Sequence, residues 1–173
     1  MHTRNEILIR GPLETCLRAG MEVERWPDIL PHYREVRFLR RDGPGAGRVR
    51  MAASRDFGPV PYPVWWVSEM VTDGARAEIR YRHVEGITRG MEVSWRLQEA
   101  GDGTRIVILH DWDGPRWPAL GGVAASLVIG PGFIRVVADR TLKGIRRHVE
   151  SGGRPGTRAR AAAGALHGEE TRG

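Results

Sequence analysis

Four residues of types that can donate or transfer a proton lie at strand positions that we predict to face inward, or at the rim of such a strand: Tyr33, Ser68, His83 and His110. An imidazole changes its charge near neutral pH, so either histidine could take up a proton from a substrate and return it. The hydroxyl groups of Tyr33 and Ser68 could donate hydrogen bonds to an oxygen atom that gains charge. These residue types suit general acid–base chemistry in a buried site.

The strand pattern also predicts an apolar wall around these groups. We assign charged residues to water, so Glu78 and Arg80 face out and their alternate neighbours Tyr81 and His83 face in. The same reasoning on the other strands predicts a lining of aromatic and thioether side chains: Trp66, Met70, Tyr81, Met91, Trp95 and Trp112. Such walls suit a flat hydrophobic or aromatic ligand.

Each of these residues also has a purely structural explanation. Inward tryptophan and methionine side chains commonly fill a core, and Ser68 could be a small packing residue. His83 or His110 could be a core histidine that donates to a backbone carbonyl. The polarity of the interior distinguishes a catalytic site from a site that only binds. Two or more ionisable groups that point toward one another favour catalysis, whereas a wholly apolar lining favours binding alone.

The order of the predicted elements explains how these side chains come together. A strand over Asn5–Arg10 is followed by two short helices, of which the second begins at Trp26-Pro27. Six strands then follow with no helix between them: Tyr33–Arg41, Arg48–Phe57, Pro63–Val71, Ala75–Val84, Arg89–Glu99 and Thr104–Asp113. Turn sequences such as Asp73-Gly74 and Gly58-Pro59 separate them, which predicts an antiparallel meander.

A helical pattern returns after the last strand. One apolar stripe predicts an amphipathic helix over Phe133–Glu150: Ile134, Val137, Ala138, Leu142, Ile145 and Val149. The predicted fold class is α+β, with a curved antiparallel sheet of about seven strands wrapped around this long C-terminal helix. A single apolar stripe cannot fill the concave face of a bent sheet, so we expect a hollow that serves as a ligand site. We expect this domain to span residues 1–151 and residues 152–173 to form a disordered or ragged tail.

Several other site types are excluded. The single cysteine, Cys16, allows neither an internal disulfide nor a multi-cysteine metal site. On a strand, His110 points opposite to Asp111 and Asp113, so these three cannot converge on a metal ion. The glycine-rich segment Gly43–Gly47 precedes a strand, whereas a phosphate loop requires a helix there. We therefore expect no metal and no cofactor.

Charge and hydropathy limit the partners. The net charge is +6 and the isoelectric point about 10.6, but the arginines are dispersed among acidic residues, so we expect no nucleic-acid surface. Glycine and proline break the uncharged run Trp117–Ile134, which we interpret as a buried or lid-like segment without stable membrane insertion. Residues Met1–Glu6 are polar and no secretory signal is evident, so we expect a cytoplasmic location.

Four stretches of the sequence resemble a known family: Val23–Tyr33, Val64–Ser68, His83–Glu85 and Val93–Trp95. They are similar to the polyketide cyclase/dehydrase branch of the START-like (SRPBCC) helix-grip superfamily, and within it to bacterial aromatase/cyclases of aromatic polyketide pathways. The similarity runs from about Asn5 to Glu150. It implies a helix-grip fold with a cavity that binds a poly-β-ketone, promotes aldol-type ring closure and assists the loss of water.

The resemblance also carries implications for individual residues. Tyr33, Trp66, Ser68 and Trp95 match pocket positions of the family, whereas Met70 stands where the aromatase/cyclases place an inward arginine. We therefore expect a cyclase or dehydratase of the lyase type. In it, His83 or His110 would act as base and acid near neutral pH, and Tyr33, Tyr81 and Ser68 would donate to the substrate oxygen.

Met70 also favours an alternative, a non-catalytic carrier or sensor of a lipid, quinone or other hydrophobic molecule. Ribosome-associated toxins and coenzyme Q-binding proteins of the same superfamily are a third possibility, supported only by the basic isoelectric point. The expected partners are a small hydrophobic or polyketide-like ligand and, through the resemblance, an acyl carrier protein or polyketide synthase. A homodimer is left open.

Overall fold

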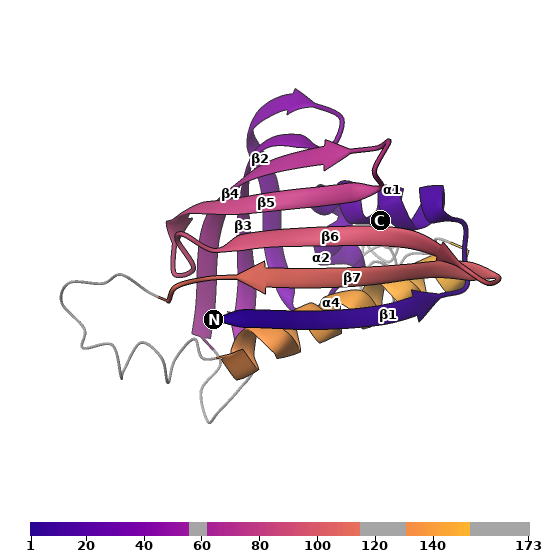
Figure 1. The fold of residues 1–173 in the computed structure, drawn as a ribbon. Helices are drawn as coiled ribbons and strands as arrows, with labels where there is room; N and C mark the ends of the chain where they lie inside the picture. Colours follow the sequence, from indigo (N-terminus) through magenta and orange to yellow (C-terminus); the bar gives the residue numbers. More distant parts are fainter. Residues whose placement is uncertain (56–61, 115–130, 153–173) are drawn as a thin grey trace, which may run out of the picture.

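One antiparallel sheet and one long helix dominate the fold (Figure 1), in a computed structural model that describes residues 1–55, 62–114 and 131–152. The seven strands are β1 (His2–Ile9), β2 (Tyr33–Gly43), β3 (Ala46–Arg55), β4 (Tyr62–Asp73), β5 (Glu78–Gly86), β6 (Glu92–Ala100) and β7 (Gly103–Asp111). The helical elements are α1 (Leu13–Met21), the 3-10 turn η1 (Val23–Arg25), α2 (Trp26–Ile29) and α4 (Pro131–Glu150).

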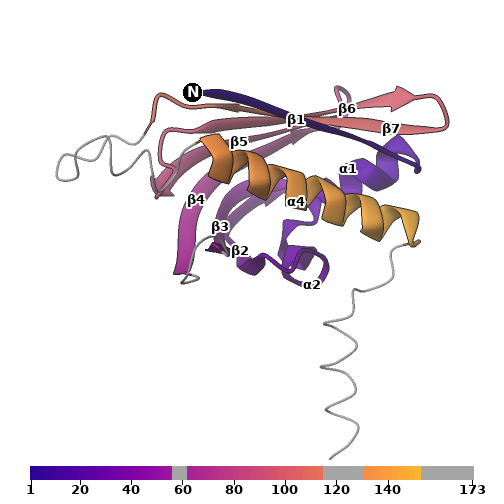
Figure 2. The ribbon, with the colours of Figure 1, turned by 90° about the horizontal axis from the view of Figure 1, so that it is seen from below.

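The strands pair in the order β1-β7-β6-β5-β4-β3-β2, and every neighbouring pair is antiparallel. All connections from β2 to β7 are therefore simple hairpins, as the closely spaced turn sequences predicted. The sheet curves around α4, which lies along its concave side, and α1 and α2 lie at one end (Figure 2). The predicted fold class is confirmed.

Alternation along the strands separates core from solvent as expected. In β7, Ile106 and Ile108 are fully buried while Asp111 is exposed, which places His110 on the inward face. In β4 the inward side chains are buried, but Trp65 and Val71 on the opposite face are about half exposed. The charged residues of each strand decide which of its two faces meets water, because burying a charged side chain without a partner is costly.

Two strands begin later than predicted because their first residues form turns. The strand expected over Ala75–Val84 begins at Glu78, and the one expected over Arg89–Glu99 begins at Glu92. In the first turn Asp73 accepts a hydrogen bond from the backbone N–H of Arg76 (3.1 Å), and Ala77 adopts a left-handed conformation with φ of 48°. The second turn brings Thr88 back over the end of β5.

Helix α4 is held close to α2 by a residue without a side chain. Its apolar stripe packs into the core through Ile134, Ala138, Leu142 and Ile145, all of which are buried. A Cβ atom on Gly144 would lie 2.2 Å from Leu30 Cδ2, so any larger residue at this position requires the Leu30 side chain to move. Glycine therefore lets α4 pack directly against the buried Leu30 side chain.

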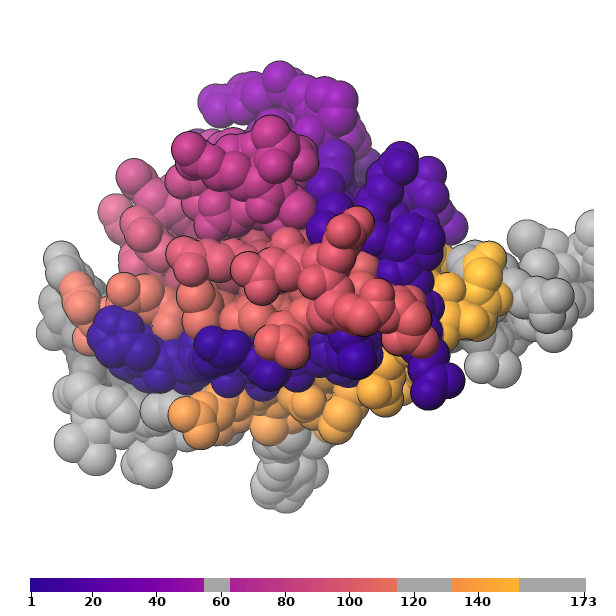
Figure 3. Space-filling model, turned by 45° about the vertical axis from the view of Figure 1, so that its right-hand side comes forward, coloured from indigo at the N-terminus to yellow at the C-terminus, as the bar shows by residue number. Residues whose placement is uncertain are grey.

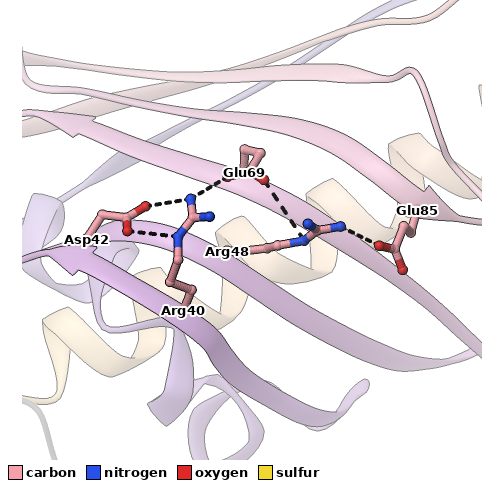
Figure 4. A network of polar contacts seen from close by, with 5 residues as sticks. All are labelled: Arg40, Asp42, Arg48, Glu69 and Glu85. Atoms are coloured by element: carbon pink, nitrogen blue, oxygen red, sulfur yellow. Dashed lines mark hydrogen bonds and ion pairs between the residues drawn. The ribbon is translucent and has the colours of Figure 1, made fainter.

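The outer face of the sheet is polar and rich in ion pairs. Figure 3 shows strands β1, β7 and β6 side by side on this face, with α4 emerging below β1. Across β2 to β5 a chain of ion pairs links Asp42, Arg40, Glu69, Arg48 and Glu85 (Figure 4). Arg40 holds both oxygens of Asp42 at 2.9 Å. The dispersed arginines thus pair with acidic residues on a solvated face.

Some predictions lie outside the described residues: the Gly58-Pro59 turn, the segment Trp117–Ile129 and residues 153–173 of the expected tail. Within the part of the chain that the structure describes, no helix has an apolar stretch long enough to cross a membrane.

Candidate functional site

A cavity lies between the concave face of the sheet and α4, where the sequence predicted a hollow. Its volume is about 80 Å³, and the unfilled space including its mouth is about 590 Å³. The sheet contributes Tyr33, Met51, Trp66, Tyr81, His83, Val93, Trp95, Ile108 and His110. The β5–β6 turn contributes Thr88 and Met91, α2 contributes Trp26, and α4 contributes Phe133, Ile134, Val137, Ala138 and Thr141.

Seven of the ten predicted site residues line this cavity: Tyr33, Trp66, Tyr81, His83, Met91, Trp95 and His110. The other three are buried but lie outside the lining. Ser68 pairs with Val49 and His83 in the sheet register, and its hydroxyl has no hydrogen-bond partner among the described residues. Trp112 donates its indole N–H to the carbonyl oxygen of Arg89 (3.0 Å), so it anchors the β5–β6 turn.

Met70 lies one inward position beyond Ser68 on β4, opposite Tyr81 and Gly47. Its side chain is 1% exposed and packs in the core. The position at which the resemblance implies an arginine is therefore occupied here by an apolar core residue.

A continuous series of aromatic rings forms one wall. Trp26 stacks on Trp95 with 5.6 Å between ring centroids and lies 5.1 Å from Tyr33. Tyr33 meets Trp66 edge-on, and Trp66 stacks on the His83 ring at 5.8 Å with an interplanar angle of 21°. Offset ring pairs of this kind fix the orientation of each side chain. The wall therefore presents rigid aromatic surfaces to a guest.

His83 is held by a threonine. Its Nδ1 atom lies 2.6 Å from Thr88 Oγ1, and its backbone N–H donates to the carbonyl oxygen of Met91. Burial, together with a smaller effect of the nearby His110, lowers the pKa of His83 to about 3. His83 is therefore neutral at physiological pH.

His110 is supported in the same way from the edge strand. Its Nδ1 atom lies 3.0 Å from Thr3 Oγ1, and burial lowers the pKa of His110 to about 4. The two histidines lie on β5 and β7 with β6 between them, so their backbones are about 10 Å apart. The expectation that these residues titrate near neutral pH is corrected, because burial removes the protonated form at pH 7.

Two tyrosine hydroxyls complete the polar groups of the cavity. Burial raises the pKa of Tyr33 to about 12, with Thr141 as an opposing hydrogen-bond partner. Burial also raises the pKa of Tyr81, and the nearby Tyr33 raises it further. Both phenols therefore stay protonated. The Thr141 hydroxyl donates to the carbonyl oxygen of Val137 (2.8 Å) and lies 3.0 Å from His32 Nε2.

The lining residues within the described ranges include no carboxylate, guanidinium or ammonium group. The described residues also contain no group of three or more His, Cys, Asp or Glu side chains placed to hold a metal ion. The arrangement is an apolar slot with neutral hydrogen-bonding groups on its walls. It can orient an uncharged guest and polarise its oxygen atoms.

Sequence reasoning did not assign several lining or supporting residues to the site, among them Thr3, Thr88 and Trp26. Thr3 lies outside the strand predicted from Asn5, although Thr3, Ile7 and Ile9 share one face of β1 and an earlier strand start would have found it. Thr88 lies in a turn, and no local signal places a turn residue against His83. Trp26 was placed at the start of a helix and within a stretch that resembles the family, but it was not assigned to the lining.

The chain matches the family described as "Polyketide cyclase / dehydrase and lipid transport" over residues 12–129. A Streptomyces cyaneus protein named "Putative polyketide cyclase" is 33% identical over 113 residues, which cover 64% of this chain and 72% of that protein. The actinorhodin polyketide synthase bifunctional cyclase/dehydratase of Streptomyces coelicolor is 29% identical over 120 residues, which cover 68% of this chain and 36% of that protein.

Solved structures show the same fold. The crystal structure of the ZhuI aromatase/cyclase from Streptomyces sp. R1128 superposes with a TM-score of 0.72 at 21% identity, covering 89% of this chain and 96% of that one. A START superfamily protein from Mycobacterium smegmatis superposes with a TM-score of 0.68 at 15% identity, covering 87% and 97% of the two chains.

Proposed function

Because this chain belongs to the polyketide cyclase / dehydrase and lipid transport family, we propose that its cavity binds a poly-β-ketone or related aromatic polyketide and promotes aldol cyclisation with loss of water. The rigid aromatic wall suits the flat ring that such a reaction forms. The neutral imidazoles and phenols can form hydrogen bonds with the ketone oxygens, which become alkoxide and then hydroxyl groups during the reaction.

The proposed reaction needs no oxidant or metal. A base removes a proton from the methylene between two carbonyl groups, and the resulting carbanion attacks a second carbonyl carbon, forming a carbon–carbon bond. The attacked oxygen becomes an alkoxide and takes up a proton. A further proton then leaves the adjacent carbon as the hydroxyl departs, so that water and a carbon–carbon double bond form.

His83 and His110 are the proposed base and proton carrier, and Tyr33 and Tyr81 are the proposed donors to the developing alkoxide. The Tyr81 hydroxyl donates a long hydrogen bond to the carbonyl oxygen of Gly20 (3.5 Å), so it must give up this bond to donate to the guest. An imidazolium is disfavoured in this cavity because burial lowers the pKa of both histidines. A proton taken from the methylene must therefore return quickly to an oxygen of the same guest. Ser68 has no proposed role in contact with the guest, because it lies outside the lining.

The observation that carries this proposal is the presence of two histidines, each held through Nδ1, in the wall of one apolar cavity. The test is to incubate the protein with a synthetic linear poly-β-ketone and follow cyclisation and loss of water by mass spectrometry. We expect His83→Gln and His110→Gln each to slow turnover about 100-fold. Thr104→Val is the matched control, since Thr104 is buried but lies outside the cavity. Unchanged turnover in both histidine variants would overturn the assignment.

The uncharged lining and the apolar Met70 support a second candidate, a carrier for a neutral hydrophobic molecule. Native mass spectrometry of the purified protein distinguishes the two. A retained lipid or quinone, recovered unchanged and without turnover of the polyketone, would favour the carrier.

We also propose, on the resemblance alone, an acyl carrier protein or polyketide synthase as the partner that delivers the guest. The proposed cytoplasmic location rests on cysteine usage, since the single residue Cys16 allows no internal disulfide. Pull-down of a purified acyl carrier protein by this chain tests the first.

A further inference from the structure

Both cavity histidines are supported by the same kind of group. His83 Nδ1 lies 2.6 Å from Thr88 Oγ1, and His110 Nδ1 lies 3.0 Å from Thr3 Oγ1. The two threonines are buried, at 5% and 4% exposure. Within residues 1–55, 62–114 and 131–152, neither threonine hydroxyl has a second hydrogen-bond partner.

A hydroxyl group differs from the usual supports of a histidine. A carboxylate or a backbone carbonyl only accepts, so it fixes the proton of a neutral imidazole on Nδ1. A threonine hydroxyl can either accept from Nδ1–H or rotate and donate to Nδ1. In the first arrangement Nε2 carries a lone pair, and in the second it carries a proton. Both histidines line the cavity and are held through Nδ1, which leaves Nε2 as the ring nitrogen available to a guest.

A third histidine provides a contrast within the same chain. The Thr141 hydroxyl donates its proton to the carbonyl oxygen of Val137, so its oxygen can only accept from His32. This arrangement favours the tautomer of His32 that carries its proton on Nε2. The hydroxyl groups of Thr88 and Thr3 have no second acceptor among the described residues. The pairs that they form with His83 and His110 therefore keep both arrangements available.

We infer that Thr88 and Thr3 are positioning residues that allow Nε2 of His83 and His110 to switch between acceptor and donor, and that the cavity selects guests whose oxygens interconvert between ketone and enol. The inference rests on the proposed function, since it requires a guest in this cavity.

The switch matches the chemistry of the proposed reaction. A ketone oxygen accepts hydrogen bonds, whereas the enol or hydroxyl that it becomes also donates one. A histidine fixed in one tautomer would satisfy only one of these states and leave a buried polar group unpaired in the other. Rotation of a threonine hydroxyl corrects the mismatch and creates no charge.

The first experiment measures the tautomers directly in the full ¹⁵N-labelled chain. The probes are 1-tetralone, which only accepts, and 1-naphthol, which also donates; long-range ¹H–¹⁵N NMR reports which imidazole nitrogen carries the proton. His83→Gln and His110→Gln assign the signals. We expect the Nε2–H tautomer at one or both histidines with 1-tetralone and the Nδ1–H tautomer with 1-naphthol, while His32 keeps its Nε2–H tautomer with both.

The second experiment tests the threonine. Thr88→Val removes the acceptor for Nδ1–H, so we expect affinity for 1-naphthol to fall about tenfold more than affinity for 1-tetralone. Thr88→Ser should restore the wild-type ratio, and the control Thr104→Val should leave the ratio unchanged. A merely structural role of Thr88 would weaken both probes equally, which would overturn the inference.

The outcomes separate this inference from the proposed function. If both probes bind and each histidine keeps one tautomer throughout, the switch is refuted while the binding cavity stands. If neither probe binds at millimolar concentration, the proposed function fails and the inference fails with it. The tautomer measurement uses the wild-type chain, so it decides the inference even if Thr88→Val does not fold.

Discussion

Lowering the pH from 7.5 to 5.0 should destabilise this protein mainly through its two cavity histidines. Burial lowers the pKa of His83 to about 3 and of His110 to about 4, against an ordinary value of 6.5. Between these values the unfolded chain binds more protons than the folded one, so stability is fully present above pH 6.5 and falls as the pH drops.

The size of the effect follows from the same values. At pH 5.0 each histidine is about 1.5 pH units below its unfolded pKa, and one unit corresponds to about 1.4 kcal/mol, so each costs about 2 kcal/mol. The two together remove about 4 kcal/mol, which is a large share of the roughly 5–15 kcal/mol of a typical domain. The carboxyl groups of Glu35 and Asp42 contribute at lower pH, because hydrogen bonds from Arg37 and Arg40 hold their pKa values down.

Urea denaturation across this pH range measures the effect in the wild type, His83→Gln, His110→Gln and the double variant. Glutamine does not titrate, so each single variant should lose about 2 kcal/mol less than the wild type, and the double variant about 4 kcal/mol less. His2→Gln is the control, since its side chain is 81% exposed. If the double variant loses as much as the wild type, the two histidines are not held neutral by burial.

Three further predictions address the guest, the backbone and the surface. The cavity wall formed by the described residues carries no charged group, so 2-naphthaldehyde should bind at least 100-fold more tightly than 2-naphthoate at pH 7, because a buried carboxylate would lack a partner there; isothermal calorimetry measures both. Ala77→Gly should raise the free energy of unfolding by up to about 1 kcal/mol, since Ala77 has a positive φ of 48°, whereas Ala52→Gly within β3 should lower it. Glu69→Gln should cost less than about 1 kcal/mol in urea denaturation, and this cost should vanish in 1 M NaCl, because its ion pairs with Arg40 and Arg48 are solvated.

The sequence was most informative about the fold and about which face of each strand points toward the core. The charged residues of each strand decide which face meets water, so Tyr81, His83, Trp95 and His110 could be assigned to the interior from alternation alone. Alternation does not tell how far along its strand a residue lies from the cavity. Ser68 was therefore predicted at the site although it packs beside it.

The support and the charge state of the histidines could not be predicted from local patterns. Thr3 reaches His110 through pairing of the first and last strands, and Thr88 reaches His83 through a turn whose shape depends on Gly90. The low pKa of each histidine depends on the depth of burial, which arises only when α4 closes over the sheet. These properties come from long-range packing.

Gly144 can affect the size of the cavity although it is not among the residues that line it. The cavity lies between the sheet and α4, and Gly144 lies where α4 meets the Leu30 side chain. A larger residue at 144 would either displace the Leu30 side chain or move α4 away from it, whereas a change in a lining side chain alters one wall only. Substitution at this contact is therefore a way to alter the size of the cavity without altering the chemistry of its lining.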